Sequence, residues 1–216
     1  MPKLTFGGSN YLVVWSDQLS VSGPNGFTTT QHFLGARVST GGVVLDPSGI
    51  AIATAPGPQG NPSVAFDRIN YIVVWLDGTQ DPVPLYGKRI KTDGRLLDGS
   101  ANSLGIPIET TTTGKTNPTV VFDGTNYLVM WAVVTGPNLN VAPNGIYGAK
   151  VSSDGQVVTS LSNPKGLLLN GPRQDFAAVF ANAVANSNQT TTLLTWTNNR
   201  EVQGSTKSIQ GLLIFP

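Results

Sequence analysis

The sequence has no cysteine and only one histidine among its 216 residues, and only 12 % of its residues are charged. The absence of cysteine excludes disulfide bonds and thiolate metal sites. The formal net charge of +1 provides no strong field for nucleic acid or for an anionic membrane surface. No apolar run approaches the ~18 residues that a membrane-spanning helix needs. We therefore expect no nucleic-acid binding and no membrane insertion.

Glycine and proline are abundant instead, with 25 and 15 residues. Thr, Asn and Ser supply most of the polarity, and no helical period of useful length occurs, so the composition is typical of short strands joined by turns. The low charge also favours a secreted or extracytoplasmic bacterial protein. No signal peptide opens the chain, so we expect the sequence to be cut from a longer or processed protein.

One apolar strand recurs along the chain. NYLVVW at 10–15 returns as NYIVVW at 70–75 and NYLVMW at 126–131, and it fades into TTLLTW at 191–196. These copies hold every tryptophan, and a phenylalanine precedes each of the first three at the same distance, which indicates a structural repeat. We predict a single domain, 1–216, built from four units at about 1–56, 57–112, 113–171 and 172–216. The residues expected in its repeated core are Trp15, Trp75, Trp131, Trp196, Phe6, Phe66, Phe122 and Phe180.

Each unit contains the pattern of four strands, here called a to d. In the second unit these are PSVAFD at 62–67, YIVVWLD at 71–77, YGKRIK at 86–91 and GIPIET at 105–110. Asp-Gly turns between such strands are a strong hairpin signal. Four antiparallel strands repeated at this length indicate propeller blades. We therefore predict an all-β fold, a four-bladed β-propeller with four antiparallel strands per blade, whose last blade lacks an obvious fourth strand.

The order of apolar strand, Asp-Gly turn, Tyr-x-Val-x-Trp strand and Gly-x-Arg strand resembles the blade repeats of bacterial secreted β-propeller proteins. VVFDGTNYLVMW, at 120–131, is also similar in layout to a hemopexin-type four-bladed repeat. This resemblance implies propeller architecture over nearly the whole chain. The cysteine pair that links the first and last hemopexin blades is absent, so the resemblance implies none of that family's ligands.

The repeat also carries charged positions. Asp17 and Asp77 stand two residues beyond their tryptophans, and Arg37 and Arg89 occupy one position of strand c. A b–c hairpin could bring each aspartate to its arginine, so we predict the salt bridges Asp17–Arg37 and Asp77–Arg89. The alternative is a ring of cations for an anionic ligand, in which Lys150 would take part.

Catalytic and metal-binding patterns are missing from the sequence. His32 has no obvious partner, most acidic residues stand in turns or at repeat positions, and no pair of facing carboxylates is apparent. We therefore expect no catalytic residue, no metal and no cofactor.

The b–c connections, at 18–32, 78–84, 134–145 and 197–207, are the segments that vary between units. Variable loops on one rim of a repeated scaffold are typical of binding surfaces. We therefore predict a non-enzymatic extracytoplasmic module that binds a protein or a glycan. One alternative is a structural module that forms homo-oligomers through the open edge of the last blade, and a second is a glycoside hydrolase-like enzyme. The predicted ligand-binding residues are Phe27, His32, Asp81, Asn138 and Asn140.

Overall fold

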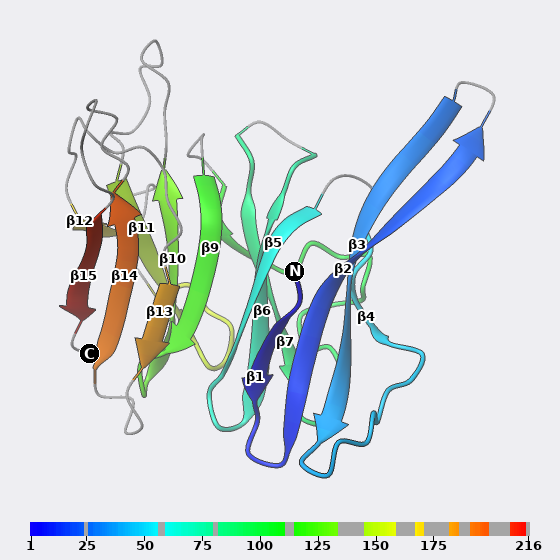
Figure 1. The fold of residues 1–216 in the computed structure, drawn as a ribbon, viewed down its shortest axis with the longest axis horizontal. Helices are drawn as coiled ribbons and strands as arrows, with labels where there is room; N and C mark the ends of the chain where they lie inside the picture. The colour runs from blue at the N-terminus through cyan, green and yellow to red at the C-terminus, as the bar shows by residue number, and fades with distance from the viewer. Residues whose placement is uncertain are drawn as a thin grey trace.

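The repeat units form separate antiparallel β-sheets in the computed structural model (Figure 1). Sheet 1 comprises β1 (Lys3–Phe6), β2 (Asn10–Gly23), β3 (Gly26–Ser39) and β4 (Ile50–Ala53). Sheet 2 comprises β5 (Gln59–Phe66), β6 (Asn70–Asp77), β7 (Leu85–Lys91) and β8 (Ile106–Glu109). Sheet 3 comprises β9 (Lys115–Phe122), β10 (Asn126–Val133), β11 (Gly145–Ser152) and β12 (Leu167–Asn170). Sheet 4 comprises β13 (Asn182–Ala185), β14 (Thr192–Asn198) and β15 (Ser208–Ile214).

Within every sheet the strands pair in the order of the chain, as successive hairpins produce. The structure describes residues 1–23, 26–55, 59–79, 82–110, 115–133, 145–158, 167–170, 182–185, 191–198 and 208–214. These residues contain strands and turns and no helix, which confirms the prediction of an all-β protein. No helix in this part of the chain could therefore cross a membrane.

The four sheets stand in a row, with sheet 1 at one end and sheet 4 at the other (Figure 1). The first strand of each sheet lies against the first strand of the next, so that β1 contacts β5, β5 contacts β9 and β9 contacts β13. The predicted strand at 175–180 lies outside the described residues, as does Phe180. In the described part of the chain sheet 4 has three strands.

The first connection between strands b and c differs from the prediction. Residues 18–32 were expected to form a loop, but β2 and β3 continue through most of this range as one long hairpin. In Figure 1 the far end of this hairpin projects beyond the other strands of the sheet. The alternating Ser, Val and Thr residues of this segment suit paired strands as well as a solvated loop, because they are compatible with a half-exposed ladder.

The turns at the opposite end of the sheets are fixed by aspartate and glycine. Asp67 Oδ1 accepts hydrogen bonds from the backbone N–H groups of Ile69 and Asn70, at 2.7 and 2.6 Å. In the c–d turns, Gly94 and Gly155 have φ values of 91° and 90°, which a residue with a Cβ rarely adopts. Asp67 is followed by Arg68, whose φ is 80°, so this turn keeps the positive φ without a glycine. The aspartate side chain and the residue of positive φ after it therefore determine where the hairpin reverses.

Each sheet has two different faces, which follow from the two-residue period of strand b. The front face of sheet 2 carries Tyr71, Val73 and Trp75 and packs against sheet 1. The rear face carries Ile72 and Val74 and packs against sheet 3. We use the terms front face and rear face for the equivalent positions in every sheet. Because both faces of sheet 2 are covered, its strand b is apolar throughout.

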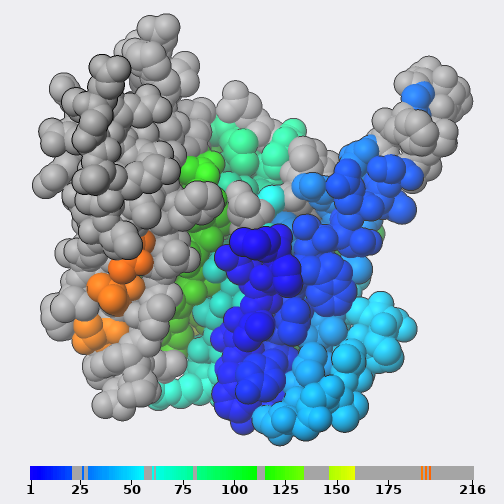
Figure 2. Space-filling model, viewed as in Figure 1, coloured from blue at the N-terminus to red at the C-terminus, as the bar shows by residue number. Residues whose placement is uncertain are grey.

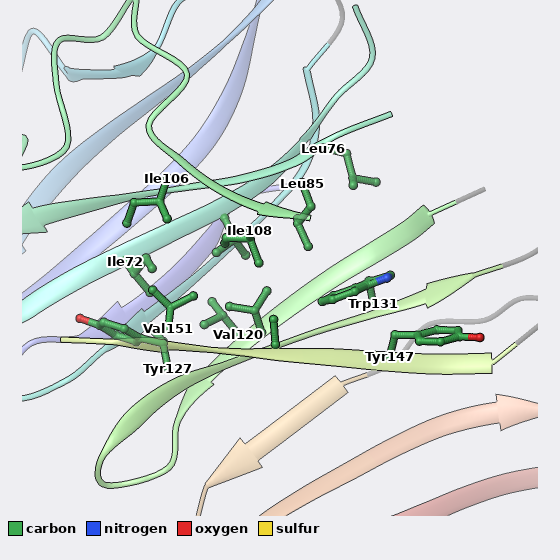
Figure 3. Close-up of a cluster of buried hydrophobic side chains, with 14 of the residues drawn as sticks. Ile72, Leu76, Leu85, Ile106, Ile108, Val120, Tyr127, Trp131, Tyr147 and Val151 are labelled. Atoms are coloured by element: carbon green, nitrogen blue, oxygen red, sulfur yellow. The ribbon is translucent and has the colours of Figure 1, made fainter. Parts of the chain in front are cut away.

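Figure 3 shows the core between sheets 2 and 3, which is built from the rear face of one and the front face of the other. Ile72, Ile106 and Ile108 come from sheet 2, and Tyr127 and Trp131 come from sheet 3. Trp75 holds the position equivalent to Trp131 in the core between sheets 1 and 2. These tryptophans are thus packed between sheets, in the role that the sequence predicts for them.

The remaining core candidates of the repeat differ in their surroundings. Phe122 is buried, and Phe66 is half-buried at the same position of sheet 2. Phe6 is exposed and Trp15 is half-buried, because no sheet covers the front face of sheet 1 in the described structure. Trp196 lies in β14 opposite Gln210. Its side chain lies outside the described residues.

Hydrogen bonds at two positions join neighbouring sheets. The hydroxyls of Tyr71 and Tyr127 donate to the carbonyl oxygens of Asn10 and Asn70 in the preceding sheet, at 3.0 and 2.8 Å. Burial raises the pKa of Tyr127, so this hydroxyl stays protonated and can donate. A tyrosine in strand b thus contacts the a–b turn of the sheet before it.

The second position is the arginine of strand c. Arg37 Nη1 donates to the carbonyl oxygen of Thr92 at 3.0 Å, and Arg89 Nη1 donates to that of Ser153 at 2.7 Å. Each arginine therefore contacts the c–d turn of the next sheet. A Cβ on Gly155 would come within 2.9 Å of the Arg89 guanidinium, so glycine is required here by packing as well as by φ.

A buried lysine is a further link between sheets 1 and 2. Lys88 Nζ donates to the carbonyl oxygens of Ile52, Ser100 and Ser103, at 3.0, 2.7 and 2.9 Å. Its ammonium group also lies 5.8 Å from the centroid of the Trp75 ring. All three N–H donors of the ammonium are therefore used, which is how a buried cation is accommodated.

We expect Lys88 to make stability depend on alkaline pH. Burial lowers its pKa from 10.5 to about 8, so between these values the unfolded chain binds more protons than the folded chain. The free energy of unfolding should therefore rise as pH increases from about 8 to about 10.5. Lys88→Met lacks the titrating group and should show no such rise. It should also lose about 2 kcal/mol at pH 7, because three carbonyls lose their donor.

Urea denaturation of both proteins at several pH values measures this difference. Other groups titrate in the same range, but they are shared by the two proteins and cancel when the profiles are subtracted. Parallel profiles from pH 8 to 10.5 would show that Lys88 does not titrate as its burial implies.

Candidate functional site

Charged side chains gather where the b strands of the sheets end, at the end opposite the Asp-Gly turns. Asp77 is the last residue of β6, Glu109 is the last residue of β8, and Lys115 is the first residue of β9. All three are buried. We call this region the connection end of the sheets. Buried ionisable groups require partners, so each one indicates either a structural pair or a functional site.

Asp77 is 1 % exposed and has one carboxylate oxygen in use. Its Oδ1 accepts a hydrogen bond from the backbone N–H of Thr79 at 3.1 Å, and its own N–H donates to the carbonyl of Pro84 at 3.0 Å. Its Oδ2 is buried and has no hydrogen-bond partner among the described residues. Such an unpaired buried acceptor is costly in a folded protein, which makes this position unusual.

An unpaired donor lies on the same face of β6. Trp75 stands two residues before Asp77, so both side chains point toward sheet 1. The indole Nε1 of Trp75 is buried and also lacks a partner in the described part of the chain. Tyr86 lies opposite Trp75 on β7, and the pKa of Tyr86 is raised by burial and by the charge of Asp77. The position therefore combines an acceptor, a donor and an aromatic wall.

Glu109 and Lys115 form a buried ion pair on the other side of sheet 2. Lys115 Nζ lies 2.5 Å from Glu109 Oε2, and the two side chains are 0 % and 3 % exposed. Burial lowers the pKa of Lys115, and the bond to Glu109 opposes that effect. The pair joins sheet 2 to sheet 3, in the way that Lys88 joins sheet 2 to sheet 1.

The two acids at the end of sheet 2 do not face each other. Glu109 lies opposite Leu85 and Leu85 lies opposite Leu76, so these three side chains share the rear face. Asp77 follows Leu76 in sequence and therefore points to the front face. Among the described residues, then, Asp77 and Glu109 do not form the pair of facing carboxylates that glycoside hydrolysis uses.

The predicted loop residues are distributed differently from the expectation. His32 lies on β3 directly opposite Asp17 of β2, so the histidine has an acidic neighbour that the sequence did not reveal. Phe27 lies on β3 opposite Ser22, and its side chain is outside the described part of the chain. The other three candidates lie outside the described residues, namely Asp81, Asn138 and Asn140.

The predicted salt bridges of strand c have other partners. Arg37 pairs with Asp46 at 2.8 Å, and not with Asp17. The pKa of Arg37 is raised by this bond, and the pKa of Asp46 is lowered by it. The register explains the difference, because Arg37 lies opposite Leu12, five residues away from Asp17.

The second predicted bridge is corrected in the same way. Arg89 pairs with Asp98 at 2.6 Å, and not with Asp77. Arg89 lies opposite Ile72 on the rear face, whereas Asp77 is on the front face at the end of β6. Asp77 is thus left free of the ion pair that the sequence assigned to it.

The described residues contain no group of three His, Cys, Asp or Glu side chains that could hold a metal ion. Ser63 Oγ, near the row of first strands, accepts a hydrogen bond from the N–H of Val120 at 3.2 Å. It therefore serves the contact between β5 and β9.

No protein-family profile matches the chain, and no curated protein matches it in sequence. Solved structures do match it over nearly its full length. A xylan β-1,4-xylosidase from Bacillus halodurans C-125 matches with a TM-score of 0.56 and 17 % identity, covering 99 % of this chain and 42 % of the xylosidase. A GH32 β-fructofuranosidase from Bombyx mori, in complex with sucrose, has a TM-score of 0.50 and 10 % identity, covering 97 % and 46 %. A GH43 endo-arabinanase from Bacillus licheniformis has a TM-score of 0.49 and 14 % identity, covering 98 % and 72 %.

These similarities show a β-propeller type of fold, as the sequence predicts, while identities of this size show the fold alone. The chain spans less than half the length of the xylosidase and of the fructofuranosidase. The prediction of a non-enzymatic binding module is wrong, and so is the expectation that the chain is not an enzyme, because the matching structures are glycoside hydrolases. The comparison favours the enzyme alternative, which the sequence ranked last.

The sequence left the relevant residues unassigned for identifiable reasons. The repeat pattern predicts a salt bridge between Asp77 and Arg89, so it indicates a structural role for Asp77. Glu109 and Lys115 interrupt the repeat pattern, but no role is assigned to them from the sequence. The position of Glu109 is held by Ala53 and Asn170 in sheets 1 and 3, and the position of Lys115 is held by Gln59 in sheet 2. A charged residue at a position that is uncharged in the other units was the available signal.

Proposed function

We propose that this chain is the propeller of a glycoside hydrolase, and that Asp77 is the carboxylate with which its described part contacts the sugar. The observation that carries the proposal is the unpaired Asp77 Oδ2 on the same face of β6 as the unpaired Trp75 indole N–H. A sugar hydroxyl both donates and accepts hydrogen bonds, so it can satisfy the two atoms together. Support also comes from the fold, which the chain shares with enzymes named for cleaving xylan and for binding sucrose.

The arrangement suits proton transfer to or from a glycosidic oxygen. Asp77 has one oxygen held by the N–H of Thr79, which fixes its orientation, and leaves the other oxygen for a substrate. Aromatic side chains at Trp75 and Tyr86 form an apolar wall of the kind that pyranose and furanose rings contact. Because Asp77 is buried, the part of the protein that covers it must move before a substrate can reach the carboxylate. Glycoside hydrolysis uses a second carboxylate, and the proposal assigns Asp77 one of the two roles.

We further propose that the four sheets correspond to four blades of a single domain over 1–216, of the bacterial secreted type. Three sheets with the same strand order and the same inter-sheet hydrogen bonds support this division. The low charge and the abundance of Thr and Asn support export. The glycan is then the partner of the protein as its substrate.

Turnover of aryl xylosides, aryl arabinofuranosides, sucrose and linear arabinan tests the function. We expect release of product from at least one of them. In Asp77→Asn, kcat/KM for that substrate should fall by about 10²–10⁴-fold, because the amide cannot transfer the proton. Asp93→Asn is the matched control, since Asp93 is exposed in a c–d turn and should leave turnover unchanged.

Thermal unfolding of both variants establishes that they are folded. If none of the four substrates is turned over, the proposed function fails. If a substrate is turned over but Asp77→Asn retains full activity, the enzyme class stands and the assignment of Asp77 is wrong.

A further inference from the structure

The front face of sheet 1 is an interface surface without its partner in the described structure. Phe6 and Tyr11 are 46 % and 38 % exposed, and their rings lie 5.0 Å apart. The equivalent pair in sheet 3, Phe122 and Tyr127, is 6 % and 0 % exposed because sheet 2 covers it. The side chains of β1 and β2 lie at the surface in Figure 2. Sheet 1 therefore presents the same apolar face that sheets 2 and 3 bury.

The hydrogen-bonding groups of this interface are present as well. Tyr71 and Tyr127 each donate to the a–b turn of a preceding sheet, whereas the Tyr11 hydroxyl has no partner among the described residues. Thr40 is the equivalent of Thr92, whose carbonyl accepts from the arginine of the preceding sheet. Gly42 keeps a φ of 81°, yet nothing lies within 4 Å of its Cβ position. The c–d turn of sheet 1 thus has the conformation that contacts a preceding sheet in the other units, but no preceding sheet contacts it among the described residues.

The rear face of sheet 4 is the complementary surface. Leu193 occupies the position of Leu12, Ile72 and Leu128, counted from the tryptophan of each unit. Those three residues are at most 2 % exposed, and Leu12 and Ile72 pack against the following sheet, whereas Leu193 is 43 % exposed. Leu213, opposite Leu193 on β15, stands where strand c of the earlier sheets has arginine or lysine. Sheet 4 therefore offers no arginine to the Thr40 carbonyl, and the tyrosine hydrogen bond is the one that the contact can repeat.

From these two surfaces we infer that the front face of sheet 1 binds the rear face of sheet 4 in a second copy of this chain. Sheets 1 and 4 lie at opposite ends of the row, so within one copy the two faces do not meet (Figure 1). The contact continues the stacking already formed between sheets 1, 2 and 3, with the same kind of face on each side. A head-to-tail contact of this type uses two different surfaces and therefore propagates from copy to copy.

Self-association tests the inference, and it does not depend on the proposed enzymatic function. Light scattering should show a mass that rises above the 22.7 kDa of one chain as the concentration increases. Phe6→Glu removes the front surface and Leu193→Glu removes the rear surface, so each variant alone should remain monomeric. An equimolar mixture should form a one-to-one dimer and nothing larger, because each variant retains one intact surface. Val158→Glu, at an exposed valine after strand c of sheet 3 and outside both faces, should assemble as the unchanged chain does.

Three outcomes would overturn the inference. A chain that stays monomeric at all concentrations shows that a second copy does not cover the face. Disruption by Phe6→Glu but not by Leu193→Glu shows pairing of two front faces. A mixture of the two variants that stays monomeric shows that the surfaces are not complementary. Circular dichroism identifies a variant that has failed to fold, and Leu4→Glu is then a second substitution of the front surface.

Discussion

Replacing Trp131 with alanine will lower the free energy of unfolding by about 3–5 kcal/mol. The indole is fully buried between sheets 2 and 3, where it packs among residues of both. Removing it takes away apolar contact on each side and leaves a cavity that a sheet interface cannot close without shifting a whole blade. The indole N–H has no partner among the described residues, so no hydrogen bond is lost to offset or enlarge this effect.

Trp15→Ala is the matched control, because Trp15 occupies the same position in sheet 1, where the described residues place no sheet in front of it. We expect a loss of about 1 kcal/mol. Urea denaturation at low protein concentration, where association between copies is minimal, measures both variants. Equal losses would show that the front face of sheet 1 is covered within a single chain, contrary to the open row of sheets.

The second large effect is expected for Arg89→Met. Arg89 bonds both carboxylate oxygens of Asp98 and the carbonyl of Ser153, so one side chain holds its own c–d turn and the next sheet. Its side chain and that of Asp98 are 14 % and 13 % exposed. Removal of the guanidinium leaves Asp98 nearly buried without its counter-charge, and we expect a loss of about 3 kcal/mol.

Arg95→Met provides the comparison for this substitution. Arg95 forms an ion pair with Asp93 at a similar distance, but the two side chains are 72 % and 49 % exposed. Exposed pairs contribute little, because water and salt screen the charges, so we expect a much smaller loss of stability than for Arg89→Met. Thermal denaturation of the two variants at pH 7 is sufficient to compare them. A small effect of Arg89→Met would mean that the inter-sheet bond to Ser153 does not contribute to stability.

At Arg37 and Arg89 the repeat pattern predicts the existence of ion pairs correctly but predicts the wrong partners. The sequence identified both arginines as a repeated structural feature and expected them to form ion pairs. It placed the partner on strand b, because a hairpin brings strands b and c together. The structure has the partner in the connection between strands c and d, at Asp46 and Asp98. This connection folds back beside strand c, so that each aspartate also accepts a hydrogen bond from the backbone N–H of its arginine.

The wrong prediction of a non-enzymatic module also depended on the predicted ion pairs. Arg89 pairs with Asp98, so Asp77 is a buried acid without an ion-pair partner. Among the described residues at the connection end, it is the one acid that has a carboxylate oxygen without either a hydrogen bond or an ion pair. The sequence could not separate it from Asp17, because both follow a tryptophan at the same distance. Burial distinguishes them, since Asp17 lies on an exposed part of the hairpin and Asp77 lies between sheets.

The sequence by itself determined the all-β fold, the recurring strand that carries the tryptophans, the turns between strands and the burial of Trp75 and Trp131. These depend on local properties, namely the two-residue period of strands and the turn preferences of aspartate and glycine, and the repetition reinforces them. Only the tertiary structure decided the partners of Arg37 and Arg89, the pair of Glu109 with Lys115, and the open face at Tyr11. These depend on how the sheets are arranged next to one another. Tyr11 and Tyr71 hold the same position of the repeat, and they differ because a sheet covers Tyr71 whereas no sheet in the described part of the chain covers Tyr11.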